Sequence, residues 1–491
     1  MHVLHLAAEC APLAKVGGLG DVVGALPPAL VAAGVEASVL MPLYGGAEGE
    51  LARRAGPLVG VHEGETSFGA QHLPFRIWRA DASPVGVPVY LLDEPVHFGG
   101  SGVYSDPSGE NLPPERWAVF QRAALDWLAA PDAPAVDLLH LHDHHAGLVP
   151  VLLRHDRALS RIAGMPTLLT VHSADHHGIA PWSVWERLNV HVDEAETLLV
   201  EDDLNALKAG VVWADAVTTV SPTYADELAT DPTVSRGLVE TFRAARRKTT
   251  GILNGIDAAH WNPATDPHLP STFSADERAG KAATKRAVCD ELGLDADRPL
   301  IAYVGRLMPE KGVELLTEGT ERVLHATEAS VALLGAGDPE HETAVRGLAL
   351  MLGREGYADR LSVTIGFDEA LAHRLYGAAD VFAMPSMSEP CGLAQLYAMR
   401  YGAPPVVHAV GGLRDTVEAW DGARGTGFRF DAFTTGAFVE ALRAALAVHA
   451  EPEAWARLVA CGMARDWSWR GPAQTYADLY GTLVGAQTPV A

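Results

Sequence analysis

The sequence predicts an α/β protein with two doubly wound parallel sheets, and three observations support this fold class. Short runs rich in Val, Leu and Ile recur along the chain, as in buried parallel strands. Alanine-rich segments with apolar residues at helical spacing, such as residues 117–128, separate these runs. The alternation stops near residue 250 and then starts again. We expect a cleft between the two sheets, because such sheets bind ligands outside the carboxyl ends of their strands.

The predicted elements follow in chain order. The first series of strands is expected at residues 2–8, 36–41, 87–92, 137–142, 166–172 and 215–220. The second series is expected at residues 299–304, 330–334, 361–365, 380–384 and 405–409. Residues 254–274 are rich in Asn, Pro, Asp and His, which favours an irregular connection. We therefore predict a first domain at 1–250, a second at 251–465 and a C-terminal segment at 466–491.

The C-terminal segment is expected to dock as helices on the first domain. Residues 452–480 contain several Trp and Tyr side chains, which are large enough that they normally pack against other elements. A helical docking segment gives these rings a buried position.

The composition is that of a folded, acidic protein. Hydrophobic residues make up 48% and charged residues 20% of the 491 positions, unlike the composition of disordered chains. The 62 Asp and Glu residues outnumber the 37 Lys and Arg residues, giving a net charge of -25. This field repels nucleic acids and anionic membranes, so we expect neither as a partner. An anionic small ligand therefore needs a local cluster of positive charge.

Cysteine usage and the start of the chain predict a cytoplasmic protein. The cysteines are widely spaced and form no CxxC pair: Cys10, Cys289, Cys391 and Cys461. That pattern fits a reducing compartment. An apolar run begins directly after Met1, which leaves no room for a signal or transit segment. The longest uncharged stretch near the start, residues 22–35, contains two prolines and is shorter than the ~20 residues of a membrane span.

A glycine-rich turn follows the first predicted strand. It runs from Lys15 through Gly17 and Gly18 into a helical pattern that ends near residue 30. Unpaired amides and the positive end of a helix favour an anion site at such a turn. The glycine spacing does not match G-x-G-x-x-G, and no acidic residue follows the second strand, which disfavours a nicotinamide dinucleotide. A structural turn with an exposed lysine is the alternative.

The most metal-like cluster ends the fourth predicted strand and contains His140, His142, Asp143, His144 and His145. It resembles the His-x-His-x-Asp-His pattern of metallo-β-lactamase-like hydrolases, with Asp143 one place early. In that pattern a zinc ion activates water. His140 and His142 share one face of the strand and Asp143 faces the other way, and further ligands would have to come from elsewhere. We expect a polar pocket here, and keep a metal-dependent hydrolase as an alternative.

Three polar, glycine-bearing loops follow strands of the second series. The first carries Arg306 and Lys311, whose guanidinium and ammonium groups can grip a diphosphate. The second carries Glu389, and the third offers backbone amides at Gly411 and Gly412. Each loop alone is typical of an ordinary surface turn. Three of them at one edge of a sheet favour a nucleotide-phosphate site.

The order and spacing of these motifs resemble the bacterial glycogen synthase and starch synthase family over nearly the whole chain. The matching segments are 15–19 (KVGGL), 21–22 (DV), 142–148 (HDHHAGL), 170–172 (TVH), 207–210 (LKAG), 221–224 (SPTY), 251–257 (GILNGID), Lys281 with Lys285, 305–307 (GRL), 311–312 (KG), 389–393 (EPCGL), 411–413 (GGL) and 466–469 (DWSW). The resemblance implies the GT-B arrangement, in which two Rossmann-like domains face each other across a deep cleft. It also implies retaining transfer of glucose from ADP-glucose to the non-reducing end of an α-1,4-glucan, with no metal or other cofactor.

The same resemblance implies the site residues. The catalytic residues are Arg306, Lys311, Glu389, His172 and Asp143. The substrate-binding residues are Lys15, Gly17, Gly18, Asn254, Phe367, Cys391, Gly392, Leu393, Gly411 and Gly412. In these roles the cations and glycine amides hold the diphosphate, Phe367 stacks on the base, and Glu389 orients the glucose. His172, Asp143 and Asn254 line the sugar pocket.

Two positions depart from the family pattern. Ser173 stands where Asn is usual, and Ala394 stands where Thr is common. Donor choice and rate therefore stay open, with UDP-glucose or a small acceptor as alternatives within the retaining GT-B glucosyltransferases. A catalytically silent glucan-binding protein is a further alternative. Four intact residues argue against it: Lys15, Arg306, Lys311 and Glu389.

Overall fold

The computed structural model describes residues 1–100, 102–106 and 108–487, and the chain folds into two units. The first contains residues 1–255 and the chain from Trp469 onward, and the second contains residues 256–468. Each is an α/β unit built on a largely parallel sheet, which confirms the predicted fold class. The last part of the predicted C-terminal segment, residues 488–491, lies outside the described residues.

The main sheet of the first unit has the strand order β12-β11-β7-β6-β1-β2-β5-β4-β3. Neighbouring strands from β12 to β5 are parallel, and β4 and β3 continue the sheet as an antiparallel hairpin. The bounds are β1 His2–Leu6, β2 Glu36–Pro42, β3 Val59–Phe68, β4 Gln71–Ala80, β5 Val89–Asp93, β6 Leu138–His142, β7 Thr167–Val171, β11 Ala216–Thr219 and β12 Thr249–Gly251. A small antiparallel sheet has the order β8-β10-β9, with bounds β8 Ile179–Pro181, β9 Leu199–Val200 and β10 Asp203–Asn205.

The hairpin of β3 and β4 is the largest element that the apolar runs do not predict. Along most of both strands, exposed side chains alternate with more buried ones. An antiparallel strand with one solvated face has this pattern, whereas the parallel strands are buried on both faces. A search for continuous apolar runs therefore finds the parallel strands and misses the hairpin.

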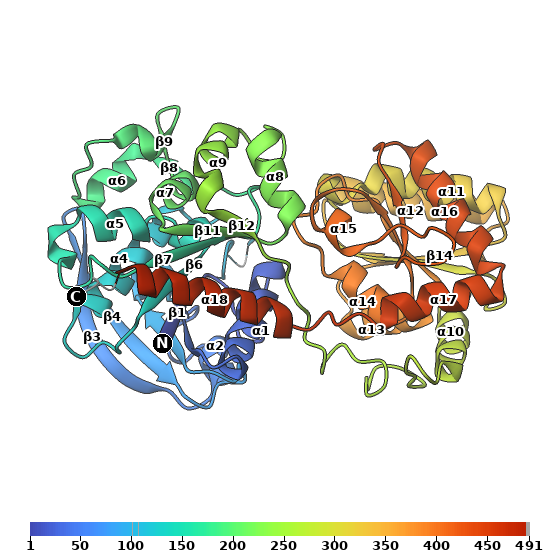
Figure 1. Cartoon of the computed structure of the whole chain (residues 1–491), viewed down its shortest axis with the longest axis horizontal. Coiled ribbons are helices and arrows are strands. Elements are labelled where there is room, and N and C mark those ends of the chain that lie inside the picture. The colour runs from blue at the N-terminus through green and yellow to red at the C-terminus, as the bar shows by residue number, and fades with distance from the viewer. Residues whose placement is uncertain (101, 107, 488–491) are drawn as a thin grey trace. The chain divides into compact units, whose positions relative to one another are not determined.

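The first unit is covered by helices, and its C-terminal helix contributes to its core. The bounds are α1 Gly18–Ala32, α2 Glu50–Ala55, α3 Pro95–Phe98, α4 Glu115–Ala129, α5 Val149–His155, α6 Trp182–Leu188, α7 Ala206–Trp213, α8 Pro222–Thr230, α9 Val239–Ala245 and α18 Arg470–Gln487, with 3-10 turns η1 His144–Ala146, η2 Arg157–Leu159, η3 Ala195–Thr197 and η4 Arg246–Lys248. Figure 1 shows α18 lying across the first unit beside α1. Trp469, Tyr476 and Tyr480 are buried there against Val22 and Leu26 of α1.

The second unit has a parallel sheet with the order β15-β14-β13-β16-β17-β18. Its strand bounds are β13 Leu300–Val304, β14 Ser330–Gly335, β15 Leu361–Ile365, β16 Val381–Met384, β17 Pro405–His408 and β18 Phe428–Phe430. Its helices are α10 Ala279–Leu292, α11 Val313–Ala326, α12 Pro339–Arg354, α13 Glu369–Ala378, α14 Ala394–Arg400, α15 Gly411–Thr416, α16 Thr435–His449 and α17 Pro452–Met463, with the 3-10 turn η5 Pro309–Lys311. All five strands predicted for the second series are present within about one residue of their expected bounds.

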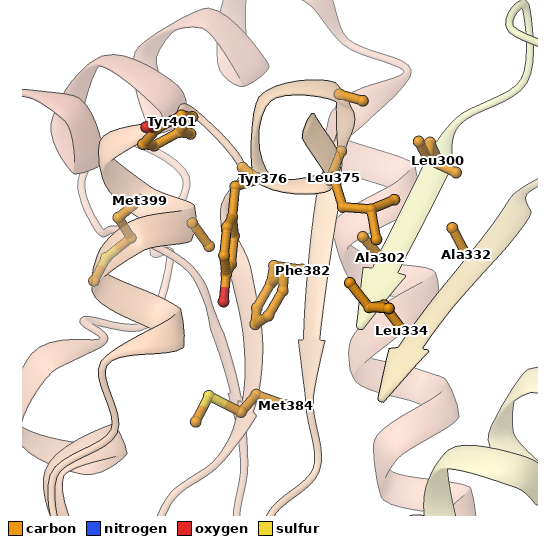
Figure 2. Close-up of a cluster of buried hydrophobic side chains, with 14 of the residues drawn as sticks. Leu300, Ala302, Ala332, Leu334, Leu375, Tyr376, Phe382, Met384, Met399 and Tyr401 are labelled. Atoms are coloured by element: carbon orange, nitrogen blue, oxygen red, sulfur yellow. The ribbon is translucent and has the colours of Figure 1, made fainter. Parts of the chain in front are cut away.

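Two apolar cores lie on the opposite faces of this second sheet. Along β13, Leu300 and Ala302 enter one core, whereas Ile301 and Tyr303 enter the other. This alternation follows from the period of two residues of a strand. Figure 2 shows the first of these cores, where side chains of the strands pack against Tyr376 and other residues of α13 and α14. Burial on both faces explains why the central strands β13 and β16 consist of apolar residues.

The chain changes units after Gly255 rather than after residue 250. The physical reason is that β12 still pairs with β11, and Ile252 is buried in the core of the first unit. The chain returns after Ser468, where Ile256 and Ser468 form a parallel bridge. Among the described residues, no helix is both long and apolar enough to cross a membrane.

Candidate active site

Three loops meet at the carboxyl edge of the second sheet. They follow β13, β16 and β17, which are neighbours in the parallel sheet, so their carboxyl ends lie side by side. The amides of Met387 and Ser388 donate to the carbonyl of Glu310, at 2.9 and 3.3 Å. The amide of Gly412 donates to the carbonyl of Glu389 at 3.0 Å. These bonds join the three loops into one backbone framework.

Glycine is required where these loops approach one another. Gly312 has φ +70°, and a Cβ there would lie 2.0 Å from the carbonyl oxygen of Pro385. Gly411 has φ +41°, and its Cβ would lie 2.1 Å from the carbonyl oxygen of Glu389. A Cβ on Gly412 would lie 2.2 Å from the carbonyl oxygen of Cys391. Any side chain at these positions would push the loops apart.

The loops place Lys311 and Glu389 in a largely buried ion pair. The Lys311 Nζ lies 2.7 Å from the Glu389 Oε2, and the side chains are 18% and 8% exposed. The Ser386 hydroxyl donates to the same carboxylate oxygen at 3.1 Å. Removing either partner would leave an uncompensated charge in this environment, which is strongly unfavourable. The pair therefore fixes one cation and one carboxylate at the edge of the sheet.

Arg306 lies on the loop that follows β13 and is 61% exposed. Its guanidinium donates to the Glu310 Oε1 at 3.1 Å, and its carbonyl accepts a hydrogen bond from the Tyr303 hydroxyl at 2.7 Å. The backbone is thus held while the charged end reaches solvent. A guanidinium in this position can rotate towards an anionic ligand above the strand ends.

The remaining predicted residues of the second unit occupy different surroundings. Cys391 is buried, and its carbonyl accepts a hydrogen bond from Gln395 at 3.0 Å. Gly392 has φ +73°, and Leu393 stands at the N-cap of α14. Phe367 is 86% exposed and follows β15, at the edge strand two places from β13. The structure therefore brings Glu389, Cys391 and Gly412 together and leaves Phe367 on the outer strand.

In the first unit, Asp143 and His172 follow the neighbouring strands β6 and β7 and contact each other. The amide of His172 donates to the Asp143 Oδ1 at 2.7 Å. Burial raises the pKa of Asp143 to about 7, although backbone hydrogen bonds from His172 and Ser173 act in the opposite direction. Asp143 also has φ 54° and ψ -164°, a region that costs a residue other than glycine about 1–3 kcal/mol. Such strain is common where a side chain is held for function.

His172 also ends a chain of buried histidines. Its Nε2 lies 2.9 Å from the Nδ1 of His142, and the Nε2 of His142 lies 3.1 Å from the Nδ1 of His5. Burial lowers the pKa of His172 and that of His5 to about 3, and it lowers the pKa of His142 well below its ordinary value. All three rings are therefore neutral at physiological pH. Each offers one donor and one acceptor, so their tautomers are coupled along the chain.

His5, His140 and His142 bring one nitrogen each within 4.8 Å of one another, but hydrogen bonds occupy both nitrogens of His140 and of His142. His140 has the Tyr480 hydroxyl at 2.8 Å from its Nδ1 and the Thr170 hydroxyl at 2.6 Å from its Nε2. Both nitrogens of His142 are engaged by His172 and His5. His144 lies beyond the strand in η1, with its ring centroid 3.8 Å from that of His145 and the two rings tilted by 40°. The geometry favours the hydrogen-bonded network over the hydrolase alternative.

The glycine-rich turn of the first unit has a partner that the sequence does not reveal. The Glu9 Oε2 accepts hydrogen bonds from the amides of Val16 and Gly17, at 2.5 and 2.9 Å. The amide of Gly17 was expected to face a phosphate, but it donates its hydrogen bond to this carboxylate instead. Added Cβ atoms at Gly17 and Gly18 would meet open space. Lys15 pairs with Asp21 at 2.7 Å, and its side chain is 43% exposed.

Asn254 follows β12 at the end of the first unit. Its Oδ1 is buried without a hydrogen-bond partner among the described residues. A buried acceptor without a partner is unusual in a native structure and needs an explanation. A substrate hydroxyl is the kind of donor that would satisfy it.

Sequence reasoning did not find several residues that shape these sites. Glu9 is buried and also accepts from the Tyr104 hydroxyl at 2.5 Å, and Tyr480 reaches His140 from the other end of the chain. A lone carboxylate in an apolar stretch after a strand was the available signal for Glu9. Tyr480 offered no signal for this contact beyond its aromatic character.

Comparison with known proteins gives the family. The family model of the starch synthase catalytic domain matches residues 2–244, and that of glycosyl transferases group 1 matches residues 285–457. The glycogen synthase of Anaeromyxobacter sp. (strain Fw109-5) is 44% identical over 493 residues, which cover 98% of this chain and 99% of that protein. The glycogen synthase of Streptococcus equi subsp. equi (strain 4047) is 38% identical over 493 residues, covering 99% of this chain and all of that protein, 100%.

Solved structures agree with this result. The catalytic domain of starch synthase IV from Arabidopsis thaliana, bound to ADP and acarbose, superposes with a TM-score of 0.87 at 32% identity and covers 99% of both chains. Sucrose-phosphate synthase from Thermosynechococcus elongatus shares the fold, with a TM-score of 0.61 at 21% identity over 99% of both chains. The chain belongs to the glycogen synthase and starch synthase family of GT-B glycosyltransferases.

Proposed function

We propose that this protein transfers glucose from ADP-glucose to the non-reducing end of an α-1,4-glucan, with retention of configuration at the anomeric carbon. The observation that carries the proposal is the buried pair of Lys311 and Glu389 on loops joined at one edge of a sheet, with Arg306 on the same framework. The family membership supports glucosyl transfer to a glucan. The likeness to a starch synthase catalytic domain solved with ADP supports the adenine nucleotide as donor.

The proposed chemistry follows from charge development. Cleavage of the bond between glucose and phosphate places negative charge on the departing diphosphate and positive character on the anomeric carbon. Lys311 is a fixed cation and Arg306 is an exposed one that can rotate towards the diphosphate. Both are proposed to stabilise the departing diphosphate more strongly in the transition state than in the ground state. Lys15 of the first unit is proposed to add a further positive charge. Glu389 is proposed to orient the glucose through its hydroxyl groups.

Three residues of the first unit are proposed to line the sugar pocket: His172, Asp143 and Asn254. The pKa of His172, lowered to about 3 by burial, leaves its ring neutral, and its Nε2 is engaged by His142. Its Nδ1 is therefore the atom available to a sugar hydroxyl. Asp143 is proposed to hold the backbone of His172, through the bond at 2.7 Å, and Asn254 to accept a bond from the sugar. Phe367 is proposed to stack on the base.

The proposal places the enzyme in the cytoplasm. Cys10, Cys289, Cys391 and Cys461 form no disulfide in the part of the chain that the structure describes, and the first three are buried. Reduced cysteines fit a reducing compartment. No cofactor takes part in the proposed reaction.

Transfer of radiolabelled glucose tests the proposal. Labelled ADP-glucose and UDP-glucose are offered separately to the full chain, each with glycogen or with maltose as acceptor. We expect label to enter glycogen faster from ADP-glucose than from UDP-glucose. An enzyme that cleaves only α-1,4 linkages should then release the labelled glucose from the glycogen. Faster transfer from UDP-glucose would reassign the donor. Transfer to small acceptors with none to glycogen would favour the alternative glucosyltransferases, and binding of glycogen without transfer would favour the silent protein.

A further inference from the structure

A second cluster of ligand-type side chains lies in the second unit, among residues that the proposed reaction does not use. His260, Glu369 and His373 each offer one atom, and these atoms lie within 4.8 Å of one another. Glu369 and His373 stand one helical turn apart on α13, so they share a face of that helix. His260 comes from the irregular connection before α10, and its Nε2 lies 3.7 Å from the Glu369 Oε1. Two segments distant in sequence thus converge on one point.

His373 is held rigidly and keeps one nitrogen unused. Its side chain is 1% exposed, and its ring stacks on Trp261 with centroids 3.9 Å apart. Its Nδ1 lies 2.7 Å from the Asp266 Oδ2, so the other nitrogen, Nε2, is the atom that it can offer to a ligand. That Nε2 is buried and makes no hydrogen bond to any part of the chain that the structure describes. A buried ring nitrogen left unpaired in this way needs a partner.

Asp266 completes a carboxylate–imidazole pair behind this nitrogen. The Tyr401 hydroxyl, on a side chain labelled in Figure 2, donates to the same Asp266 oxygen at 2.6 Å. The Asp266 carboxylate oxygen lies at hydrogen-bond distance from the Nδ1 of His373, and this contact fixes the proton of His373 on Nδ1. Metal-binding histidines almost always have such a partner on the second nitrogen, which leaves the first with its lone pair free.

We propose that His260, Glu369 and His373 bind one divalent transition-metal ion of the zinc class, with Asp266 orienting His373. Two imidazoles and one carboxylate form a donor set that zinc accepts, with a fourth position left to water. Ligand atoms at about 2.0–2.2 Å from a tetrahedral ion lie about 3.4 Å apart, closer than the present spacing. The side chains of His260 and Glu369 are 48% and 53% exposed and can rotate to close this difference, whereas His373 stays in place.

The bound ion would fasten the connection that follows the change of unit to the start of α13. Asp368, the N-cap of that helix, separates Glu369 from the exposed Phe367. The ring of His268 lies 4.8 Å from that of His373. If a protein side chain rather than water is the fourth ligand of the metal ion, His268 is the imidazole that can supply it. None of the three ligands belongs to the residues proposed for glucosyl transfer. The metal site can therefore be tested independently of that function.

Zinc titration of the full chain tests the site. The protein is stripped with a chelator, freed of it by gel filtration, and titrated with Zn²⁺ in competition with a chromogenic chelator. The variants are His260→Ala and Glu369→Gln, both at exposed positions where the fold should tolerate the change. The matched control is His325→Ala, which removes a histidine from another exposed His–Glu pair of the same unit, 3.0 Å from Glu355. Melting of the stripped proteins checks that all four are equally folded.

The expected result is one zinc ion bound per chain by the wild type and by His325→Ala. Loss of a ligand should weaken binding at least as much as loss of an orienting partner, which costs about 10–100-fold in affinity. Zinc should raise the melting midpoint of the wild type and of the control only. Cobalt in place of zinc should give the visible absorption of a tetrahedral or five-coordinate site, absent from both ligand variants. A wild type that binds no zinc, or ligand variants that bind it as tightly as the control, would overturn the proposal.

Discussion

Among single residues, Lys311 and Glu389 contribute most to the proposed chemistry because both are largely buried and each neutralises the other. Such a pair adds little net stability, since the cost of removing two charges from water offsets their attraction. Its value lies in holding a cation and a carboxylate at fixed positions before substrate binds. An incoming diphosphate can then share the Lys311 ammonium without reorganisation of the site.

We predict that Lys311→Ala and Arg306→Ala each lower kcat by about 10²–10³, the loss expected when one preorganised electrostatic contact is removed. Steady-state kinetics with the donor varied at saturating glycogen measures the effect. The control is Arg322→Ala, which removes another exposed guanidinium of the second unit, 3.7 Å from Glu318. Near-normal turnover by both site variants would remove these assignments.

Asp143 gives a pH-dependent prediction at the same scale. Its folded pKa, raised to about 7 by burial, lies above the ordinary value of about 4. Folding therefore favours the protonated form, and the corresponding stability is present below pH 4 and is lost as the pH rises to 7. The difference corresponds to about 4 kcal/mol. We expect the stability of Asp143→Asn, relative to wild type, to increase by up to this amount between pH 4 and pH 8.

Chemical denaturation of both proteins across this pH range measures the prediction. Asp202→Asn, which makes the same change at an exposed turn of the first unit, is the matched control. If Asp143→Asn differs from wild type by a constant amount, the carboxyl is not titrating near neutrality in the folded protein.

At the scale of elements, α18 links the end of the chain to the strands that carry the histidines. The Tyr480 hydroxyl lies 2.8 Å from the Nδ1 of His140, and the Nε2 of His140 lies 2.6 Å from the Thr170 hydroxyl. His140 and Thr170 stand on β6 and β7, the strands that precede Asp143 and His172. The helix thus supports the strands that position two proposed site residues.

We predict that Tyr480→Phe destabilises the protein by about 1–3 kcal/mol, the cost of leaving a buried ring nitrogen without its partner. Phenylalanine keeps the apolar ring, so the loss reports the hydroxyl alone. Tyr357→Phe, at a half-buried tyrosine that contacts Arg360 in the second unit, is the control and should be nearly neutral. Thermal melting followed by circular dichroism compares the variants, and equal midpoints for Tyr480→Phe and wild type would contradict the role of this contact.

For the whole molecule, the two units differ in how their chains are assembled. The second unit is one continuous segment whose ends meet, with the amide of Ile256 donating to the carbonyl of Trp467 at 2.8 Å. The first unit is discontinuous, because Trp469, Tyr476 and Tyr480 return to its core after the second unit has been completed. Burial of one large apolar side chain is worth about 1.5–3 kcal/mol, so the first unit depends on this return.

We predict that a fragment of residues 256–468 folds alone and melts cooperatively, whereas a fragment of residues 1–255 exposes its core and binds a hydrophobic dye. Joining residues 469–487 through a flexible linker to the fragment of residues 1–255 should restore cooperative melting of that fragment, because it returns the missing aromatic side chains. Calorimetry and dye fluorescence of the three purified fragments measure these outcomes. Cooperative melting of residues 1–255 alone would show that α18 is dispensable for folding.

The sequence by itself determined the fold class, the family and most of the parallel strands, but not the short strands β12 and β18. These properties depend on local information: continuous apolar runs for strands buried on both faces, and short motifs such as residues 389–393 and 411–413. The three loops that carry Lys311, Glu389 and Gly412 could be predicted to lie together, since parallel strands deliver their carboxyl ends to one edge. The amphipathic hairpin of β3 and β4 could not be found from apolar runs.

Only the tertiary structure decided which side chains meet across long stretches of sequence. It showed that Glu9 occupies the amide of Gly17, that Tyr480 reaches His140, and that His260 converges with Glu369 and His373. Local periodicity sets the element that a residue joins and the face it occupies, but not the residue that packs opposite it. That choice depends on how distant segments fill the same volume, and it is made when the elements pack.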